Sequence, residues 1–234
     1  MKYENTCRAV FLERINRFTA RAELDGKTET VHVKNTGRLR ELLIPGSEVW
    51  LARSDNPARK TRYDLIAVRK RDGVLYNIDS QAANTVTLEW LRRQDWDEIR
   101  PEYRYGASRV DFFMRKGDRK VLMEVKGCTL ERDGTGYFPD APTERGVKHL
   151  RELAAAAGEG WHSCLAFVIQ TEGVTEVLPN RQTHPAFGEA LDAAKLAGVR
   201  VLYLPCRVTA DSLSILDRPE NRILSCAGGR DMIE

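Results

Sequence analysis

The sequence lacks the features that mark membrane and secreted proteins. No apolar run approaches the ~20 residues that a membrane-spanning helix needs. The first residues, Met1 to Asn5, lack the apolar core of a signal peptide. We therefore expect a cytoplasmic protein with no membrane partner.

Cysteine is scarce, and its spacing argues against two kinds of cross-linked fold. The cysteines are odd in number and scattered, and none forms a Cys-x-x-Cys pair, so neither a disulfide framework nor a zinc knuckle is indicated. Cys128 follows Lys126 by two residues, but no general base accompanies it, and we expect a buried structural thiol rather than a nucleophile. The five cysteines are Cys7, Cys128, Cys164, Cys206 and Cys226.

What is present is the composition of an ordinary globular protein. The 234 residues are 42% hydrophobic and 30% charged, which is enough to bury one large core or two modest ones. No internal repeat or low-complexity linker interrupts the chain. Two domains, if present, should therefore pack closely.

Positive charge is concentrated in the first part of the chain. Residues 1–85 hold 16 lysines and arginines against 11 acids, and the remainder holds 21 against 23, although the net charge of the whole chain is only +3. Cations beside aromatic rings suit a surface that follows DNA, because cations meet phosphates while rings stack on bases. The alternative is that Phe18 is a core residue and the charges solvate a small barrel. The candidate nucleic-acid-binding residues here are Arg14, Arg17, Phe18, Arg21 and Arg38.

Short β-like runs fill the first part, and helices alternate with strands in the second. The short runs lie at 10–24, 29–33, 48–52, 64–69 and 74–78, separated by turns, which is typical of a small β-barrel. After about residue 85 the pattern predicts helices at 87–93, 143–157 and 184–196, a hairpin at 109–126, and strands at 163–170 and 199–204. We therefore expect two domains, 1–85 and 86–234. The second is an α/β core with a mixed sheet flanked by helices, and the whole is α+β.

The hairpin carries the residues that say most about chemistry. In its second arm, a period of two places Leu122, Glu124 and Lys126 on one face and apolar residues on the other. The first arm holds Asp111, and a turn at 116–118 places it across from Glu124 if the register is regular.

Two carboxylates at such a short distance repel each other unless a cation lies between them. Mg²⁺ or Mn²⁺ would suit the position, because hard cations take carboxylate, phosphate and water oxygens. A lysine one pleat away can hold a phosphate or align a water molecule. The hairpin thus predicts phosphodiester cleavage, with Asp111, Glu124 and Lys126 as catalytic residues.

The same residues have a plainer interpretation. Short Glu-x-Lys matches are common, and a hairpin with charges on one side is typically a solvated sheet face. Two neighbours favour a site instead: an apolar run precedes Glu124, and Gly127 allows close backbone approach just after Lys126.

Asp111 followed by Glu124-x-Lys126 resembles the PD-(D/E)xK nuclease pattern, and the chain up to about Leu204 resembles the sugar fermentation stimulation protein A family. One position departs from that family, which usually has Gln after Arg-Gly where this chain has Val147. The segments that carry the resemblance are specific as a set: Asn35-Thr36-Gly37, Pro45-Gly46-Ser47-Glu48-Val49-Trp50, Ser54-Asp55-Asn56-Pro57, Ser108-Arg109-Val110-Asp111-Phe112, Glu124-Val125-Lys126, Phe138-Pro139-Asp140-Ala141 and the stretch from Thr143 to Leu153.

The resemblance implies an N-terminal OB-fold-like β-barrel, a PD-(D/E)xK nuclease-like second domain and DNA as the partner. It also implies that Glu89, on the helix before the hairpin, is a third metal contact beside Asp111 and Glu124. On the helix after the hairpin, Arg145 and His149 lie four residues apart on one side and are further nucleic-acid-binding candidates. Basic residues on helices also commonly face solvent, which is the alternative for both.

The leading prediction is a DNA-binding, Mg²⁺- or Mn²⁺-dependent phosphodiesterase. The alternative is a non-catalytic DNA-binding regulator of sugar (maltose-type) metabolism genes, and a third class, a sugar or nucleotide sensor, has no dedicated motif. The intact set of two acids and a lysine favours the enzyme, because a pure binder would not need it. The oligomeric state stays open, with a homodimer as one alternative.

Overall fold

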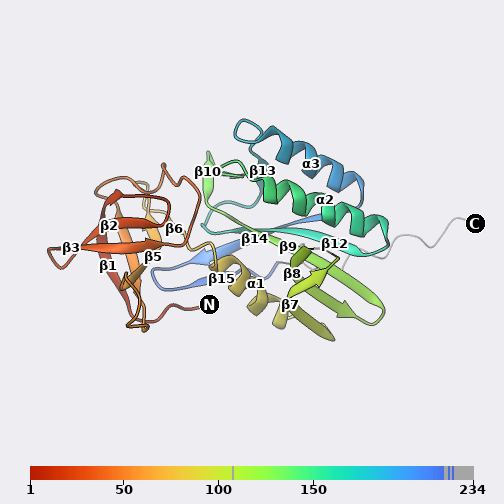
Figure 1. Cartoon of the computed structure of the whole chain (residues 1–234), viewed down its shortest axis with the longest axis horizontal. Helices are drawn as coiled ribbons and strands as arrows, with labels where there is room; N and C mark the ends of the chain where they lie inside the picture. The colour runs from red at the N-terminus through yellow and green to blue at the C-terminus, as the bar shows by residue number, and fades with distance from the viewer. Residues whose placement is uncertain (107, 219–220, 222, 224–234) are drawn as a thin grey trace, which may run out of the picture.

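The computed structural model describes residues 1–106, 108–218, 221 and 223, which form two domains packed side by side (Figure 1). The first domain is a β-barrel, drawn in red to orange, and the second is a sheet with helices on both faces. The strands of the first domain are β1 (Thr6–Arg14), β2 (Thr19–Leu24), β3 (Lys27–Val33), β4 (Glu48–Arg53), β5 (Tyr63–Arg69) and β6 (Leu75–Asn77).

The first domain is a closed five-stranded barrel. Its strands follow the order β3-β2-β1-β4-β5, a parallel pairing of β3 with β5 closes the ring, and β6 extends it beside β5. Phe11, Val31, Leu51 and Leu65 fill the interior, each at most 1% exposed. The barrel expected from the sequence is confirmed, because residues of all five strands pack into one apolar core.

The run predicted as one strand at 10–24 is a hairpin of β1 and β2. The side chain of Asn16 makes the turn, because its Oδ1 accepts hydrogen bonds from the backbone N–H groups of Phe18 (2.8 Å) and Thr19 (3.0 Å). Such Asn side chains replace a backbone turn contact, which a search for Gly or Pro overlooks.

The second domain is built on a mixed six-stranded sheet in the order β15-β14-β12-β9-β8-β7. The strands β9, β12 and β14 are parallel to one another, and β7, β8 and β15 are antiparallel to their neighbours. A small sheet, β10-β11-β13, lies beside it. The strands are β7 (Glu98–Tyr105), β8 (Ser108–Lys116), β9 (Arg119–Cys128), β10 (Leu130–Arg132), β11 (Thr135–Phe138), β12 (His162–Ile169), β13 (Val177–Pro179), β14 (Arg200–Val208) and β15 (Leu213–Ile215).

Helices cover both faces of the main sheet, α1 (Ala82–Arg92) on one face and α2 (Glu144–Gly158) with α3 (Pro185–Leu196) on the other (Figure 1). Met123 packs toward α1, whereas Leu122 packs toward α2 and α3. The alternation predicted for this strand is therefore confirmed, and it places Glu124 and Lys126 on the face that α2 covers.

Helix α1 begins at Ala82, five residues before the predicted start at 87. The stretch Asn84-Thr85 looks unfavourable for a helix, but Ala82, Ala83 and Val86 are buried against the sheet, and this packing outweighs weak local propensity. The domain boundary predicted at residue 85 consequently falls inside α1, whereas the barrel strands end at Asn77.

The described part of the chain contains no helix of the length and apolarity that crossing a membrane requires.

Two leucines near helix ends offer a matched test of this packing. Leu91 of α1 is 0% exposed, whereas Leu196 of α3 is 91% exposed. Leu91→Ala should lower the free energy of unfolding by about 2–5 kcal/mol, because it removes buried methyl groups and leaves a cavity. Leu196→Ala should change it by less than about 0.5 kcal/mol. Urea denaturation followed by circular dichroism measures both, and equal effects would contradict the docking of α1.

Candidate functional site

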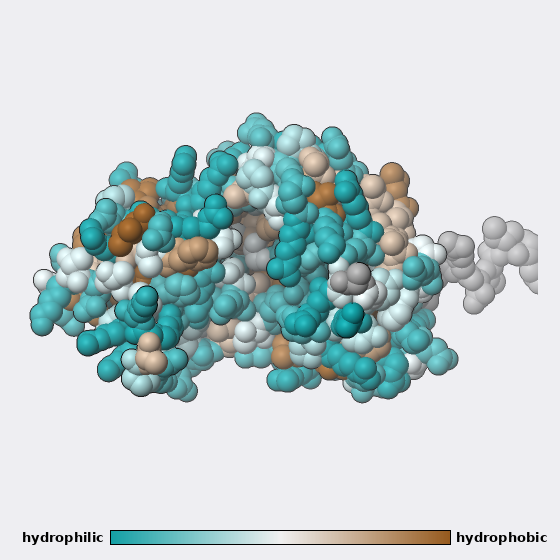
Figure 2. Space-filling model, viewed as in Figure 1, coloured by the Kyte–Doolittle hydropathy of each residue, from teal (hydrophilic) through white to brown (hydrophobic). Residues whose placement is uncertain are grey.

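A cavity of about 640 Å³ lies between the two domains. Figure 2 shows the surface hollowed between the barrel and the second domain. The barrel contributes the residues 35–37, the hairpin contributes Asp111 and Glu124, and the first turns of α2 contribute Arg145 and His149. The polar residues predicted on the hairpin and on α2 therefore meet in one cavity.

Asp111 lies on β8 beside Glu124. Phe112 pairs with Met123 in the last pair of the β8–β9 ladder, and Asp111 is the next residue along β8, close enough to Glu124 for the two carboxyls to interact. The Asp111 carboxylate accepts two hydrogen bonds, from the backbone N–H of Val125 to Oδ2 (2.7 Å) and from Asn84 Nδ2 to Oδ1 (2.7 Å). Burial and the neighbouring Glu124 raise the pKa of Asp111 above its ordinary value.

Glu124 is the most buried charge at the site, with 2% of the residue exposed. Its Oε1 accepts hydrogen bonds from Lys126 Nζ (2.6 Å) and from Nδ1 of His149. Burial alone would raise the pKa of Glu124, but the hydrogen bonds and charges of His149 and Lys126 bring it below its ordinary value. The two neighbouring carboxyls thus have pKa values shifted in opposite directions.

His149 is oriented from its other side. Its Nε2 lies 3.2 Å from Arg145 Nε, and this contact fixes the ring so that Nδ1 is directed at Glu124. Both residues come from α2, which begins after Thr143, whose Oγ1 accepts from the backbone N–H of Gly146 (3.0 Å). The pair predicted to contact nucleic acid therefore also holds the Glu124 carboxylate in place.

The structure does not bring Glu89 to these acids. Glu89 lies one turn beyond Thr85 on α1, and its Oε2 accepts from the amino group of Met1 at 2.5 Å. The residue of α1 that faces the cavity is Asn84, which bonds Asp111 directly. Across residues 1–106, 108–218, 221 and 223, no three His, Cys, Asp or Glu side chains group around a common metal position.

The oxygens of Asp111 and Glu124 still fit a hard divalent cation. Glu124 Oε2 takes no hydrogen bond from the described residues, and it belongs to a carboxylate that lines the cavity. Two carboxylates are a sufficient protein contribution for Mg²⁺, which commonly completes its shell with water and phosphate oxygens. The donor set would exclude soft metals, which prefer thiolates.

Of the predicted nucleic-acid-binding residues on the barrel, Arg14 has a structural task. Its guanidinium donates to backbone carbonyls in the hairpin turn and in the loop after β3, including those of Asn35 (2.7 Å) and Gly37 (2.7 Å). Burial lowers the pKa of Arg14. Arg17 and Arg38 are exposed, and Arg21 pairs with Glu13 at 2.5 Å on the surface.

The position of Phe18 decides whether this ring is part of the barrel core. Phe18 is 54% exposed and therefore is not a core residue of the barrel. An exposed ring beside Arg17 is available for stacking on a base.

Sequence reasoning missed three residues that shape the site. Asn84 orients Asp111, Asp140 joins the cavity wall to the barrel, and Gln170, at the end of β12, packs against Gly127. Asp140 had a signal, because Phe138-Pro139-Asp140-Ala141 was among the segments of the family resemblance. Asn84 and Gln170 had none, because their roles depend on contacts across the fold.

Cys128 is the buried structural thiol that the sequence predicted. Its Sγ lies 3.7 Å from the carbonyl oxygen of Leu130, and burial raises its pKa to about 12. Such a thiol is not a nucleophile at neutral pH. Cys226 lies outside the described residues.

Family models match both domains of the chain. The model of the sugar fermentation stimulation protein RE domain matches residues 80–212, and the model of the SfsA N-terminal OB domain matches residues 12–78. The two matches meet where the barrel strands end and α1 begins.

Two relatives and one solved structure agree with these matches. The sugar fermentation stimulation protein homologs of Desulfitobacterium hafniense (strain Y51) and Clostridium beijerinckii are 50% and 47% identical, each over 93% of this chain and over 96% and 97% of their own lengths. The structure of Pyrococcus furiosus SfsA in complex with Ca²⁺ superimposes with a TM-score of 0.81 at 26% identity, covering 92% of this chain and 95% of that one.

Asp111→Asn tests the electrostatics of the site without any cofactor. Because the folded state raises the pKa of Asp111, the ionised carboxylate destabilises the fold at neutral pH, and this cost disappears as the pH falls below the ordinary carboxyl range. A flipped Asn84 amide would accept from the new side chain, so both hydrogen bonds survive. We expect a higher urea midpoint for Asp111→Asn near pH 7 and little difference near pH 3.

Asp97→Asn is the control of opposite sign. The Gly117 amide and then the Lys116 ammonium hold the pKa of Asp97 below its ordinary value, so its stabilisation is present at neutral pH and is lost as the pH falls. This variant should lower the midpoint near pH 7. If Asp111→Asn lowered it as well, the strained state of Asp111 would be refuted.

Proposed function

This chain belongs to the sugar fermentation stimulation protein family, and from that premise and the geometry of the site we propose that it binds DNA and hydrolyses phosphodiester bonds with the help of Mg²⁺ or Mn²⁺. One observation carries the proposal: Asp111, Glu124 and Lys126 line the same cavity beside His149. Opposed pKa shifts in neighbouring carboxyls are typical of sites that perform chemistry. The Ca²⁺ complex of the Pyrococcus relative supports a hard cation in this family.

The residues divide the work by their contacts. A cation held by Asp111 and Glu124 would polarise the phosphodiester and make a bound water more acidic. Lys126 presents its ammonium to a phosphate oxygen or to the attacking water, one pleat from Glu124. His149 and Arg145 fix the orientation of Glu124 from the side of α2. Asn84 does the same for Asp111.

A second candidate is a DNA-binding regulator of sugar-metabolism genes that does not cleave its target. Two observations favour it: Lys126 already neutralises Glu124 at 2.6 Å, and the described residues offer no three-residue metal group. In that case the cluster would act as a phosphate clamp. The two candidates differ in turnover, which is directly measurable.

Lys126→Met separates the two candidates. Its loss should reduce metal-dependent DNA cleavage at least ~100-fold, because charge stabilisation or water alignment is removed. Binding of Mn²⁺, measured by calorimetry, should persist, because Lys126 is a cation and its removal takes away one of the two hydrogen bonds at Glu124 Oε1. Cleavage is measured on single- and double-stranded DNA with Mg²⁺, Mn²⁺ or chelator.

Two variants calibrate that comparison. Lys195→Met, at an exposed position near the end of α3, should leave cleavage unchanged, and Asp111→Asn should weaken Mn²⁺ binding. If the wild-type protein binds DNA tightly but shows no metal-dependent cleavage, the proposal of hydrolysis is wrong and the regulator is the function that remains. If wild type and Asp111→Asn bind Mn²⁺ equally well, the cation does not bind at this site.

The barrel surface can be tested through the salt dependence of binding. Arg17 and Arg38 are exposed, so replacing both with Gln should reduce the slope of log affinity against log salt by roughly 0.7–0.9 for each phosphate that the protein no longer neutralises. Lys195→Gln serves as the control. Arg14 is left intact, because it holds backbone carbonyls and its loss would disturb the loop. An unchanged slope in the double variant would move DNA binding off this face.

A further inference from the structure

We infer that the cavity accepts a single, unpaired nucleic-acid strand and that the barrel enforces this choice by walling one side of the cavity. The wall is the segment Asn35-Thr36-Gly37, called the wall loop below. The inference rests on the proposed function of the site, and it names the class of substrate that the site takes.

The wall loop touches the second domain directly. The backbone N–H of Leu39, just after it, donates to Asp140 Oδ2 at 3.0 Å. A Cβ atom on Gly37 would lie only 2.8 Å from the same oxygen, so backbone and carboxylate are in close contact. Because Asp140 also lines the cavity, the barrel and the second domain are in contact at this side of it.

Arg14 holds the shape of the loop from the barrel side. One guanidinium reaches the carbonyl oxygens of Asn35 at 2.7 Å, Gly37 at 2.7 Å and Arg38 at 2.8 Å. Charge-assisted bonds to three neighbouring carbonyls restrict the loop to one conformation.

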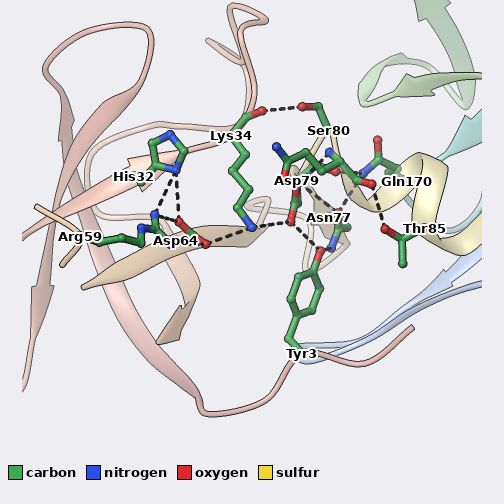
Figure 3. A network of polar contacts seen from close by, with 11 residues as sticks. Tyr3, His32, Lys34, Arg59, Asp64, Asn77, Asp79, Ser80, Thr85 and Gln170 are labelled. Carbon is green, nitrogen blue, oxygen red and sulfur yellow. Dashed lines mark hydrogen bonds and ion pairs between the residues drawn. The ribbon is translucent and has the colours of Figure 1, made fainter. Parts of the chain in front are cut away.

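Lys34, the residue before the wall loop, ties it to the junction of the domains (Figure 3). Its ammonium lies between Asp64 Oδ2 of the barrel (3.0 Å) and Asp79 Oδ2 of the segment that leads into α1 (3.4 Å). Burial alone would lower the pKa of Lys34, but Asp79 and Asp64 hold it above its ordinary value, so the ammonium stays charged. The Lys34 carbonyl also accepts from Ser80 Oγ at 2.5 Å.

The same network reaches the floor of the cavity. Gln170 Nε2 donates to the carbonyl of Asp79 (2.9 Å) and to Asn77 Oδ1 (2.8 Å). Gln170 lies against Gly127, the residue after Lys126, so closely that a Cβ there would be 2.3 Å from Oε1. Wall and floor are therefore parts of one hydrogen-bonded unit. Moving the wall away from the floor would expose nearly buried charges, of which the Asp79 side chain is only 3% exposed.

Size and depth then select the substrate. The cavity of about 640 Å³ has the volume of a small-molecule pocket, which is enough for one or two nucleotides. Glu124 is nearly fully buried on its floor, so the phosphodiester must enter the cavity to reach it. A base-paired strand would carry its partner into the wall, and enzymes with such pockets take unpaired or extruded nucleotides because unpairing costs free energy.

The test compares matched single-stranded and duplex DNA of the same sequence. Wild type should cleave the single strand at least ~10-fold faster, because opening a duplex costs more than one tenfold step in rate. Lys34→Met, which releases the wall from Asp64 and Asp79, should reduce that ratio. Arg8→Gln, at an exposed barrel position, should leave the ratio unchanged, and thermal melting confirms that each variant is folded. Equal rates on both substrates in wild type would overturn the inference while the proposed hydrolysis stands.

Binding provides a readout that does not depend on cleavage. Fluorescence anisotropy with Ca²⁺ and a labelled strand of about 12 nucleotides, within the range of an OB fold, compares wild type with Thr36→Trp, which fills the exposed edge of the wall loop. The bulky residue should weaken single-strand binding and spare duplex binding. If Thr36→Trp weakens single-strand binding but the wild type cleaves no DNA, the proposed hydrolysis is wrong and the selection of single strands is supported. Single-strand affinity unchanged by Thr36→Trp would overturn the selection itself.

Discussion

A carboxylate in an almost water-free position is the constraint on which the site depends. Glu124 is carried into the interface between the sheet and α2 by the alternation of β9, and an uncompensated charge there would cost several kcal/mol. Lys126 compensates it from the same strand face and His149 from the helix above. Asp111 forms no ion pair within the described part of the chain, and burial together with the charge of Glu124 raises its pKa. The asymmetry leaves one acid already neutralised and the other strained.

The contact between the domains has the same physical character. Lys34 is shared between two acids, one on each side of the junction, and the side chains of both acids are at most 9% exposed, so each needs a partner from the protein. A polar junction of this kind orients two domains more strictly than an apolar patch would, because every donor and acceptor must find its partner. The contacts of Lys34 with both acids thus set the position of the wall loop beside the cavity.

The parts of the fold that follow from local pattern were predictable from the sequence. Alternation fixed the faces of β9, the Thr143 cap and the alanine-rich stretch located α2, and turn residues marked most barrel strands. Strand β7 was missed because Glu98–Tyr105 is an edge strand with Pro101 in its middle and little apolar alternation. The pairing of Asn84 with Asp111, 27 positions apart, and the diversion of Glu89 to Met1 depend on how α1 packs, which no local pattern states.

The contacts of Lys2 and Tyr3 show how the barrel is connected to the second domain. Lys2 pairs with Ser212 and Tyr3 donates its backbone N–H to the carbonyl of Asp211, so these two residues lie on the second domain, ahead of β1. The chain returns through Asn77 and Asp79, whose side chains contact the Tyr3 hydroxyl at 3.0 and 3.3 Å. The barrel is thus an inserted module with its entry and exit strands clasped together. Because the entry and the exit of the barrel lie together, excising the barrel would leave two chain ends close enough to be joined by a short linker.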